Sequence, residues 1–188
     1  MRGNTIKILI VGSRYTGKGQ IGREWGQTDA DLPTLQPVIL YDRNVVCEDK
    51  QYRVVAWVLS YDPEFADLRQ AFFPGTDGIV FTYDITEDPT NTLLQLDKYA
   101  RELNRVFLRF PPSILVGVRL NESRDVSQAA RARGLAWATD RGIQMVEANY
   151  LDKQHFSSAV DQAFTLLIKA ALAAIRTGND LVNPFKFF

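Results

Sequence analysis

The stretch that decides the fold is Ile6-Lys7-Ile8-Leu9-Ile10-Val11, followed directly by Gly12-Ser13-Arg14-Tyr15-Thr16-Gly17-Lys18-Gly19. The first part is an apolar run of strand length, the second fits the pattern G-x-x-x-x-G-K, and helical periodicity begins after it. Such a loop curls backbone N–H groups around an anion, and its lysine reaches terminal phosphates. The sequence predicts a phosphate-binding loop; the alternative interpretation is a glycine-rich turn with an exposed lysine.

Outward from this loop, apolar runs alternate with stretches of helical periodicity along the chain. We expect strands at residues 6–11, 38–47, 52–59, 78–83, 113–118 and 143–147, and helices at 18–27, 63–73, 89–110, 125–141 and 154–176. The polar stretch Glu48-Asp49-Lys50-Gln51 predicts a hairpin between the second and third strands. We therefore predict an α/β fold in three layers, with a mostly parallel six-stranded sheet, one antiparallel edge strand and about five helices.

The composition bounds the class of protein. The 188 residues, 46% of them hydrophobic, suffice for one globular domain, and 22 basic residues balance 22 acidic ones. A balanced charge gives no reason to expect a nucleic-acid partner or an anionic membrane surface. The N-terminus does not read as a signal peptide, and no apolar run reaches the roughly 18 residues of a membrane span. We expect a cytoplasmic protein.

Three further stretches resemble landmarks of the Ras superfamily of small GTPases, the Rab-like group especially. They are Phe73-Pro74-Gly75-Thr76-Asp77-Gly78-Ile79-Val80-Phe81-Thr82-Tyr83-Asp84-Ile85-Thr86, then Ile114-Leu115-Val116-Gly117-Val118-Arg119-Leu120-Asn121, and Met145-Val146-Glu147-Ala148-Asn149-Tyr150. They are similar to that family's fourth strand, base-recognition strand and closing motif, in the same order. The resemblance implies a Ras-like P-loop domain over residues 1–176. An aromatic tail at 177–188 follows, and because it has no cysteine we expect no prenyl membrane anchor.

Against the family pattern, the metal and switch positions are altered. Gly19 stands where the family has the serine or threonine that ligates magnesium, and Val58 stands where it has the switch II aspartate. Tyr61 replaces the glycine that senses the third phosphate, and Asp62 replaces the glutamine that orients the attacking water. The resemblance implies weak or absent magnesium binding and absent or very slow hydrolysis. Thr34 is either a retained switch I contact or an ordinary loop threonine.

The base-recognition motif is also altered. The family's aspartate accepts two hydrogen bonds from guanine, whereas Asn121 offers one acceptor oxygen. We therefore expect reduced selectivity for guanine. Arg119 either stacks on a base or is a solvated loop residue. The backbone N–H of Tyr150 is the remaining candidate contact to a base.

Arg14 enlarges a position at which the family favours a small residue. It acts either as a built-in phosphate clamp or as a solvent-facing arginine. We expect no catalytic and no metal-ligating residues. The candidate nucleotide-binding residues are Gly12, Ser13, Arg14, Tyr15, Thr16, Gly17, Lys18, Gly19, Gln20, Thr34, Arg119, Asn121 and Tyr150.

These observations lead to two expectations for function. In the first, the chain is an atypical member of the family that binds GDP or GTP weakly or without turnover. It then acts through protein partners at a switch-like surface around Thr34, Tyr61 and Asp62. In the second, it is a functional GTP-binding switch with slow hydrolysis, used in signalling or vesicle trafficking.

Overall fold

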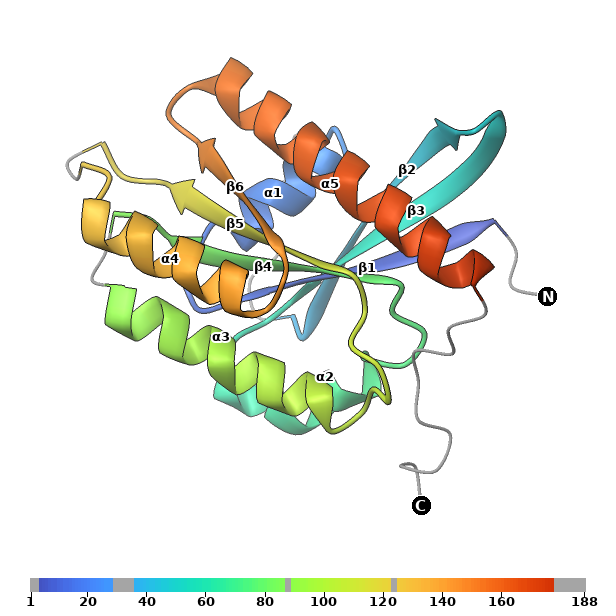
Figure 1. Cartoon of the computed structure of the whole chain (residues 1–188), viewed down its shortest axis with the longest axis horizontal. Helices are drawn as coiled ribbons and strands as arrows, with labels where there is room; N and C mark the ends of the chain where they lie inside the picture. Colours follow the sequence, from blue (N-terminus) through green and yellow to red (C-terminus); the bar gives the residue numbers. More distant parts are fainter. Residues whose placement is uncertain (1–3, 29–35, 87–88, 123–124, 178–188) are drawn as a thin grey trace.

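The structure, a computed structural model, describes residues 4–28, 36–86, 89–122 and 125–177, with only the backbone of 89–91. A six-stranded sheet forms its centre, with the strand order β2-β3-β1-β4-β5-β6 (Figure 1). The strands are β1 (Thr5–Gly12), β2 (Val38–Cys47), β3 (Lys50–Leu59), β4 (Gly78–Asp84), β5 (Ser113–Arg119) and β6 (Gln144–Asn149). All neighbouring strands are parallel except β2 and β3. The prediction of one antiparallel edge strand is confirmed.

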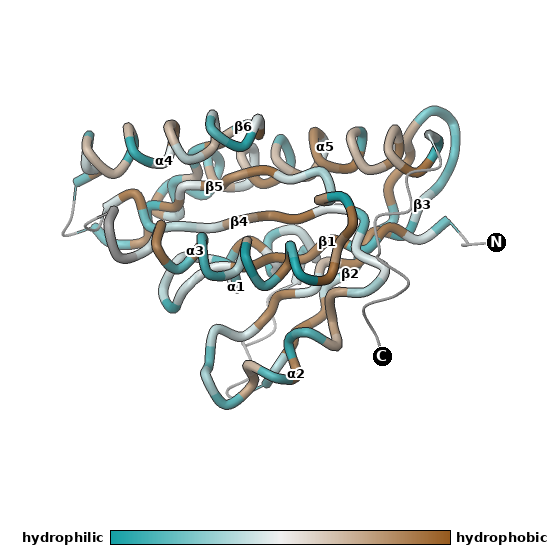
Figure 2. The backbone as a smooth tube through the Cα atoms, turned by 60° about the horizontal axis from the view of Figure 1, so that its bottom comes forward, coloured by the Kyte–Doolittle hydropathy of each residue, from teal (hydrophilic) through white to brown (hydrophobic). Residues whose placement is uncertain are grey.

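Helices cover both faces of the sheet and make three layers (Figures 1 and 2). On one face, α1 (Lys18–Trp25) and α5 (Lys153–Arg176) share a core cluster with the strands. On the other face, α3 (Pro89–Asn104) and α4 (Gln128–Asp140) build the second cluster. A 3-10 turn (Pro63–Phe65) and the short α2 (Ala66–Ala71) follow β3. The prediction of three layers with about five helices is confirmed.

The apolar run of β1 shows why the chain folds this way. Ile6, Ile8 and Ile10 belong to the cluster under α1 and α5, whereas Leu9 and Val11 belong to the cluster under α3 and α4. Successive side chains of a strand point to opposite faces, so a strand covered on both faces needs apolar residues at every position. This run positions the phosphate loop, because β1 ends where the loop begins.

The helix α5 is, among the described residues, the one helix whose length and hydropathy would suffice for a membrane span. Its apolar side chains are instead used inside the domain. Phe156, Phe164 and Leu167 are buried in the core, and the ring of Phe164 stacks on that of Trp25 of α1 at 4.0 Å between centroids. We therefore describe α5 as the core helix of this domain.

Several predicted boundaries were wrong, each for a local reason. The hairpin turn has two residues rather than four, because Glu48 and Asp49 both adopt positive φ, at 51° and 59°, as a type I′ turn requires. The predicted helix 89–110 ends at Asn104, where the N–H groups of Val106 and Phe107 donate back to the carbonyl of Leu103. Both side chains then turn into the core.

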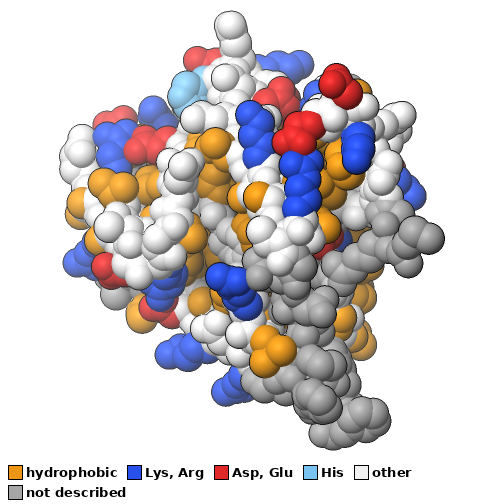
Figure 3. Space-filling view, turned by 45° about the vertical axis from the view of Figure 1, so that its right-hand side comes forward, with side chains coloured by type: hydrophobic (Ala, Val, Ile, Leu, Met, Phe, Trp, Pro, Cys, Tyr) orange, Lys and Arg blue, Asp and Glu red, His pale blue; other side chains and the backbone are white. Residues whose placement is uncertain are grey.

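The second and fourth helices are also shorter than predicted. The predicted helix 63–73 is broken into a 3-10 turn and six residues of α2. The predicted helix 125–141 begins at Gln128, because the hydroxyl of Ser127 accepts from the N–H of Ala130 at 3.2 Å and caps it. Basic and acidic side chains are interspersed on the face that Figure 3 shows, in keeping with the balanced charge of the chain.

Candidate functional site

The phosphate loop, residues 12–19, joins the carboxyl end of β1 to α1. Its base is tied to the sheet by a buried pair of hydroxyls: Thr16 Oγ1 lies 2.8 Å from Thr82 Oγ1 of β4 and donates to the carbonyl of Ser13 at 3.0 Å. A Cβ at Gly12 would lie 2.6 Å from the Thr16 oxygen and 2.1 Å from that of Thr82. The glycine at position 12 is therefore required by this close approach.

The upper part of the loop leaves its backbone donors open. Gly17 takes the left-handed conformation (φ 78°) directly before α1, and its carbonyl accepts the N–H of Ile21. Within the described residues, no backbone carbonyl accepts an N–H group from residues 14–19. Successive unpaired N–H groups at a helix N-terminus make a concavity that fits an anion such as a phosphate.

Lys18 folds back over this concavity. Its Nζ donates to the carbonyl of Ser13 at 2.8 Å. Burial, helped by the positive charge of Arg14, lowers the pKa of Lys18 to about 8. The cation therefore stands at the loop, held by one protein oxygen that a phosphate can replace.

Neither nearby tyrosine fills the loop. Tyr15 is 82% exposed and adopts a positive φ of 59°, which is a strained conformation for a bulky residue. Tyr61 lies against Tyr99 of α3, with 6.3 Å between ring centroids. The loop itself is left open to a ligand from the solvent side.

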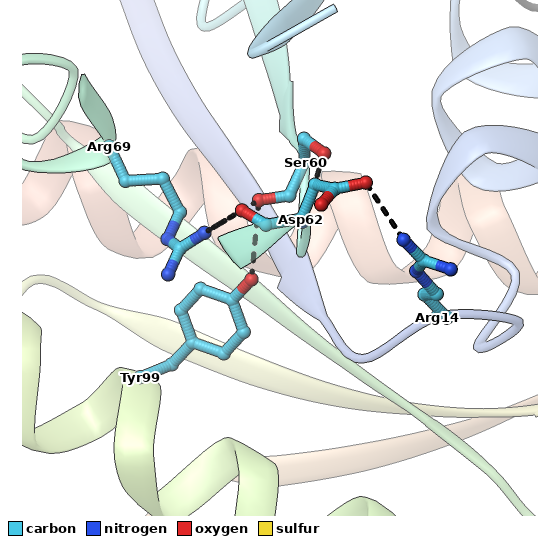
Figure 4. Close-up of polar contacts among 5 residues, drawn as sticks. All are labelled: Arg14, Ser60, Asp62, Arg69 and Tyr99. Carbon is cyan, nitrogen blue, oxygen red and sulfur yellow. Dashed lines mark hydrogen bonds and ion pairs between the residues drawn. The ribbon is translucent and has the colours of Figure 1, made fainter. Parts of the chain in front are cut away.

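An ion pair joins the loop to the switch II segment, residues 57–63. Arg14 Nη2 donates to Asp62 Oδ2 at 2.8 Å (Figure 4). The Arg14 side chain is 58% exposed and that of Asp62 is 19% exposed. Arg14 thus faces the solvent, as one of its two interpretations expects, and its guanidinium also binds Asp62. A direct contact to phosphate stays a prediction.

The backbone around Asp62 is held by side chains of α2 and α3 (Figure 4). Arg69 is only 3% exposed, and its Nη1 donates to the carbonyls of Asp62 at 3.0 Å and of Ser60 at 3.3 Å. The hydroxyl of Tyr99 also reaches the Ser60 carbonyl, at 3.5 Å, and burial raises the pKa of this tyrosine. Glu102 lies 3.8 Å from Arg69 Nε and supplies the opposite charge. Sequence reasoning missed Arg69, since only the fold brings α2 against this segment.

The side chains at the metal positions do not fit magnesium. Gly19 has no side-chain oxygen, and Val58, a residue of β3, has an apolar side chain that is buried in the core against α1. Across residues 4–28, 36–86, 89–122 and 125–177, no group of three or more His, Cys, Asp or Glu side chains is placed to hold a metal ion. Magnesium prefers oxygen ligands such as carboxylates and hydroxyls. Thr34, the remaining candidate, lies outside the described residues.

The base-recognition positions are partly occupied by the protein itself. Val118 is buried beneath the loop, where a Cβ on Gly17 would meet its Cγ1 at 2.7 Å. The N–H of Tyr150 donates to the carbonyl of Arg119 at 3.0 Å. The guanidinium of Arg119 lies 3.5 Å from the carboxylate of Asp125, and Asn121 is exposed in the loop after β5. A contact from the Tyr150 N–H to a base stays a prediction, and it requires this N–H to be shared between the base and the Arg119 carbonyl.

A cavity of about 510 Å³ lies beside the loop, between α1 and the start of α5. Two candidate residues, Gln20 and Tyr150, line it together with Arg23, Lys153 and Phe156. Its volume is in the range of small-molecule sites. The structure thus brings the loop, Gln20 and Tyr150 to the end of the sheet where the carboxyl ends of the parallel strands meet. This end is the usual place for a ligand site in such sheets.

Comparison with known proteins identifies the family. A sequence model of the Ras family matches residues 7–173. The chain is 25% identical to GTP-binding protein yptV2 of Volvox carteri over 177 residues, and the aligned region covers 89% of this chain and 76% of that protein. It is 25% identical over 149 residues to Ras-related protein Rab-18-B of Danio rerio, covering 77% and 70% respectively. It is 23% identical over 166 residues to Ras-related protein RABA5b of Arabidopsis thaliana, covering 87% and 73%. Together with the fold and the loop, these matches establish that the chain belongs to the Ras family of small GTPases.

Proposed function

We propose that this chain is an atypical Ras-like protein that binds a guanine nucleotide through its phosphate loop, without magnesium and with little or no hydrolysis, and that it acts by binding protein partners. One observation carries the proposal. The loop keeps the features that hold phosphates, whereas Gly19 and Val58 supply none of the oxygen atoms that would hold magnesium. Affinity then rests on the backbone donors and on Lys18.

The switch II segment supports the absence of turnover. A residue that orients an attacking water needs a side chain free to bind that water. The carboxylate of Asp62 is bound by Arg14 and carries a negative charge toward the phosphates. No other described group in this segment is a general base near the loop, since Ser60 Oγ accepts the N–H of Asp62 and Tyr61 packs on Tyr99.

The partner surface that we propose is the one around Tyr61 and Asp62, extended along α2, where Leu68 is an exposed apolar residue. Arg69 fixes the backbone beneath this surface. A surface held in one conformation suits a partner that binds continuously rather than one that is released at each cycle. Thr34, on the neighbouring side, lies outside the described residues. We place this interaction in the cytoplasm.

A second candidate is a slow GTP-binding switch in signalling or vesicle trafficking. The name of the Volvox carteri relative, a GTP-binding protein, favours it, as does the intact Gly17-Lys18 pair. The two candidates differ in turnover, which one assay can measure.

The test combines nucleotide binding with phosphate release. We expect GDP to bind the purified protein in the absence of magnesium and GTP to be hydrolysed no faster than in buffer. Lys18→Ala should weaken GDP binding at least tenfold, because a hydrogen bond to a charged group contributes about 1.5–3 kcal/mol. Lys50→Ala, at the exposed hairpin turn, is the matched control and should bind as the wild type does. Magnesium-dependent phosphate release above the buffer rate would instead favour the slow switch.

A further inference from the structure

The carboxylate of Asp62 is delivered to the mouth of the phosphate loop by a residue of the loop itself. Arg14 Nη2 and Asp62 Oδ2 are 2.8 Å apart, although the two residues are 48 positions apart in the chain (Figure 4). The carboxylate therefore stands within the reach of one arginine side chain of the loop. A phosphate that extends beyond the loop toward switch II meets this ion pair.

The position of the carboxylate is fixed by its own backbone. The N–H of Asp62 donates to Ser60 Oγ at 3.1 Å, and its carbonyl accepts from Arg69 Nη1 at 3.0 Å. Arg69 is almost fully buried, with Glu102 and the ring of Tyr99 beside it. Moving Asp62 away from the loop would therefore require this buried network to rearrange.

We propose that Asp62, by holding Arg14, makes the site selective for nucleoside diphosphates over nucleoside triphosphates. This inference rests on the proposed nucleotide binding and goes further by naming the phosphate number. The backbone donors and Lys18 serve the two phosphates that the loop encloses. Because Asp62 holds Arg14, a third phosphate gains no positive contact from that arginine and approaches the carboxylate instead, while Gly19 and Val58 offer no side-chain oxygen for a metal that would offset the repulsion.

The position of the Arg14 guanidinium decides whether the site prefers diphosphates or triphosphates. If Arg14 left Asp62 for a third phosphate, the site would gain a positive contact and prefer triphosphates. The pairing at 2.8 Å and the buried support of Asp62 argue that the arginine stays on the carboxylate. The inference thus predicts that removing the charge of Asp62 releases Arg14 to serve the third phosphate.

The experiment compares the dissociation constants of GDP and of a non-hydrolysable GTP analogue by titration calorimetry in EDTA. The wild type should bind GDP at least tenfold more tightly than the analogue. Asp62→Asn should reduce this ratio to threefold or less, mainly by tightening analogue binding. Asp67→Asn, which removes an exposed carboxylate of α2, should leave the ratio as in the wild type. Inorganic pyrophosphate and tripolyphosphate, as competitors, should show the same preference without any base.

The outcomes separate the two claims. Equal binding of both nucleotides to the wild type, or an unchanged ratio in Asp62→Asn, would overturn the inference and leave nucleotide binding standing. Binding of neither nucleotide at millimolar concentration would overturn the proposed function, and the inference with it. Circular dichroism shows whether Asp62→Asn is folded. If it is not, Arg14→Gln is measured instead; it leaves the charge of Asp62 unpaired and should raise the ratio of the two dissociation constants above that of the wild type. A lower ratio would overturn the inference.

Discussion

The buried guanidinium of Arg69 donates to the backbone carbonyl of Asp62, while the carboxylate of the same residue binds Arg14 of the phosphate loop. Asp62 is thus held from two sides, by α2 and by the loop. In this family the switch II segment is ordered by contacts to the third phosphate and its metal. Here the protein supplies the ordering contacts from its own side chains.

Arg69→Met tests the strength of this support. The substitution removes one of the hydrogen bonds to each of the Ser60 and Asp62 carbonyls, and it leaves the partly buried Glu102 without its opposite charge. We expect the free energy of unfolding to fall by about 3 kcal/mol, measured by urea denaturation. Arg101→Met, at an exposed position of α3, should change it by less than about 0.5 kcal/mol. Equal small effects of the two substitutions would show that the Arg69 network does not stabilise the domain.

The same network predicts a switch II segment that does not respond to the nucleotide. A ligand shifts a conformational equilibrium only if it binds the two states with different affinity. We therefore expect matching hydrogen-exchange profiles for the switch II segment and α2, residues 57–71, with GDP and with a GTP analogue bound. A clear difference between the profiles, confined to this segment, would contradict a nucleotide-independent conformation.

Gly17→Ala tests the packing beneath the phosphate loop. An alanine there would adopt φ 78° and place its Cβ 2.7 Å from Val118 Cγ1. We expect a loss of about 3 kcal/mol of stability, since both left-handed strain and overpacking contribute. Gly142→Ala is the matched control, because its φ is 63° and a Cβ there meets nothing within 4 Å. It should cost about 1 kcal/mol, from strain alone. Equal losses would remove the role of the Val118 contact.

The pH dependence of binding tests Lys18. Burial lowers its pKa from 10.5 to about 8, so the cation is present at pH 7 and is lost as the pH rises through 8. Affinity for GDP should therefore fall between pH 7 and pH 9. Lys18→Arg keeps its charge in this range and should show little fall. A wild-type affinity that is constant from pH 7 to 9 would argue against a direct contact of the lysine with phosphate.

The pKa of Lys18 also has a consequence for stability, with the opposite sign. The folded state disfavours the charged lysine, so this residue costs stability below pH 8, and the cost shrinks as the pH rises from about 8 to 10.5. Lys7 has its pKa lowered to about 8 as well, by burial. Stability alone therefore does not separate the two lysines. Binding does, since Lys7 Nζ donates to the carbonyls of Phe72 and Pro74, after α2, away from the loop.

The sequence predicted the elements whose signals are local. The apolar run of β1 and the glycine pattern after it lie within fourteen consecutive residues, 6–19, and both stand where they were expected. Helix ends were predicted less well, because they depend on capping by Ser127 and on the entry of Val106 and Phe107 into the core. The Ser127 cap is a local contact that sequence reasoning missed, whereas the entry of Val106 and Phe107 into the core is decided by tertiary packing.

The candidate site divides in the same way. The loop residues follow from one motif, but the pairing of Arg14 with Asp62 joins positions that only the fold brings together. The use of the Tyr150 N–H by the Arg119 carbonyl likewise depends on the register of β5 and β6. Contacts of this kind, between residues far apart in the chain, have no periodicity in the sequence, which is why sequence reasoning missed them.

Nucleotide binding without magnesium is tested most directly by a calorimetric titration of GDP into the wild-type protein, once with magnesium and once with EDTA. We expect binding whose dissociation constant differs by no more than threefold between the two conditions, because Gly19 and Val58 offer the metal no side-chain oxygen. Binding that is tightened tenfold or more by magnesium would contradict it, and would show that other oxygen atoms hold the metal at this site.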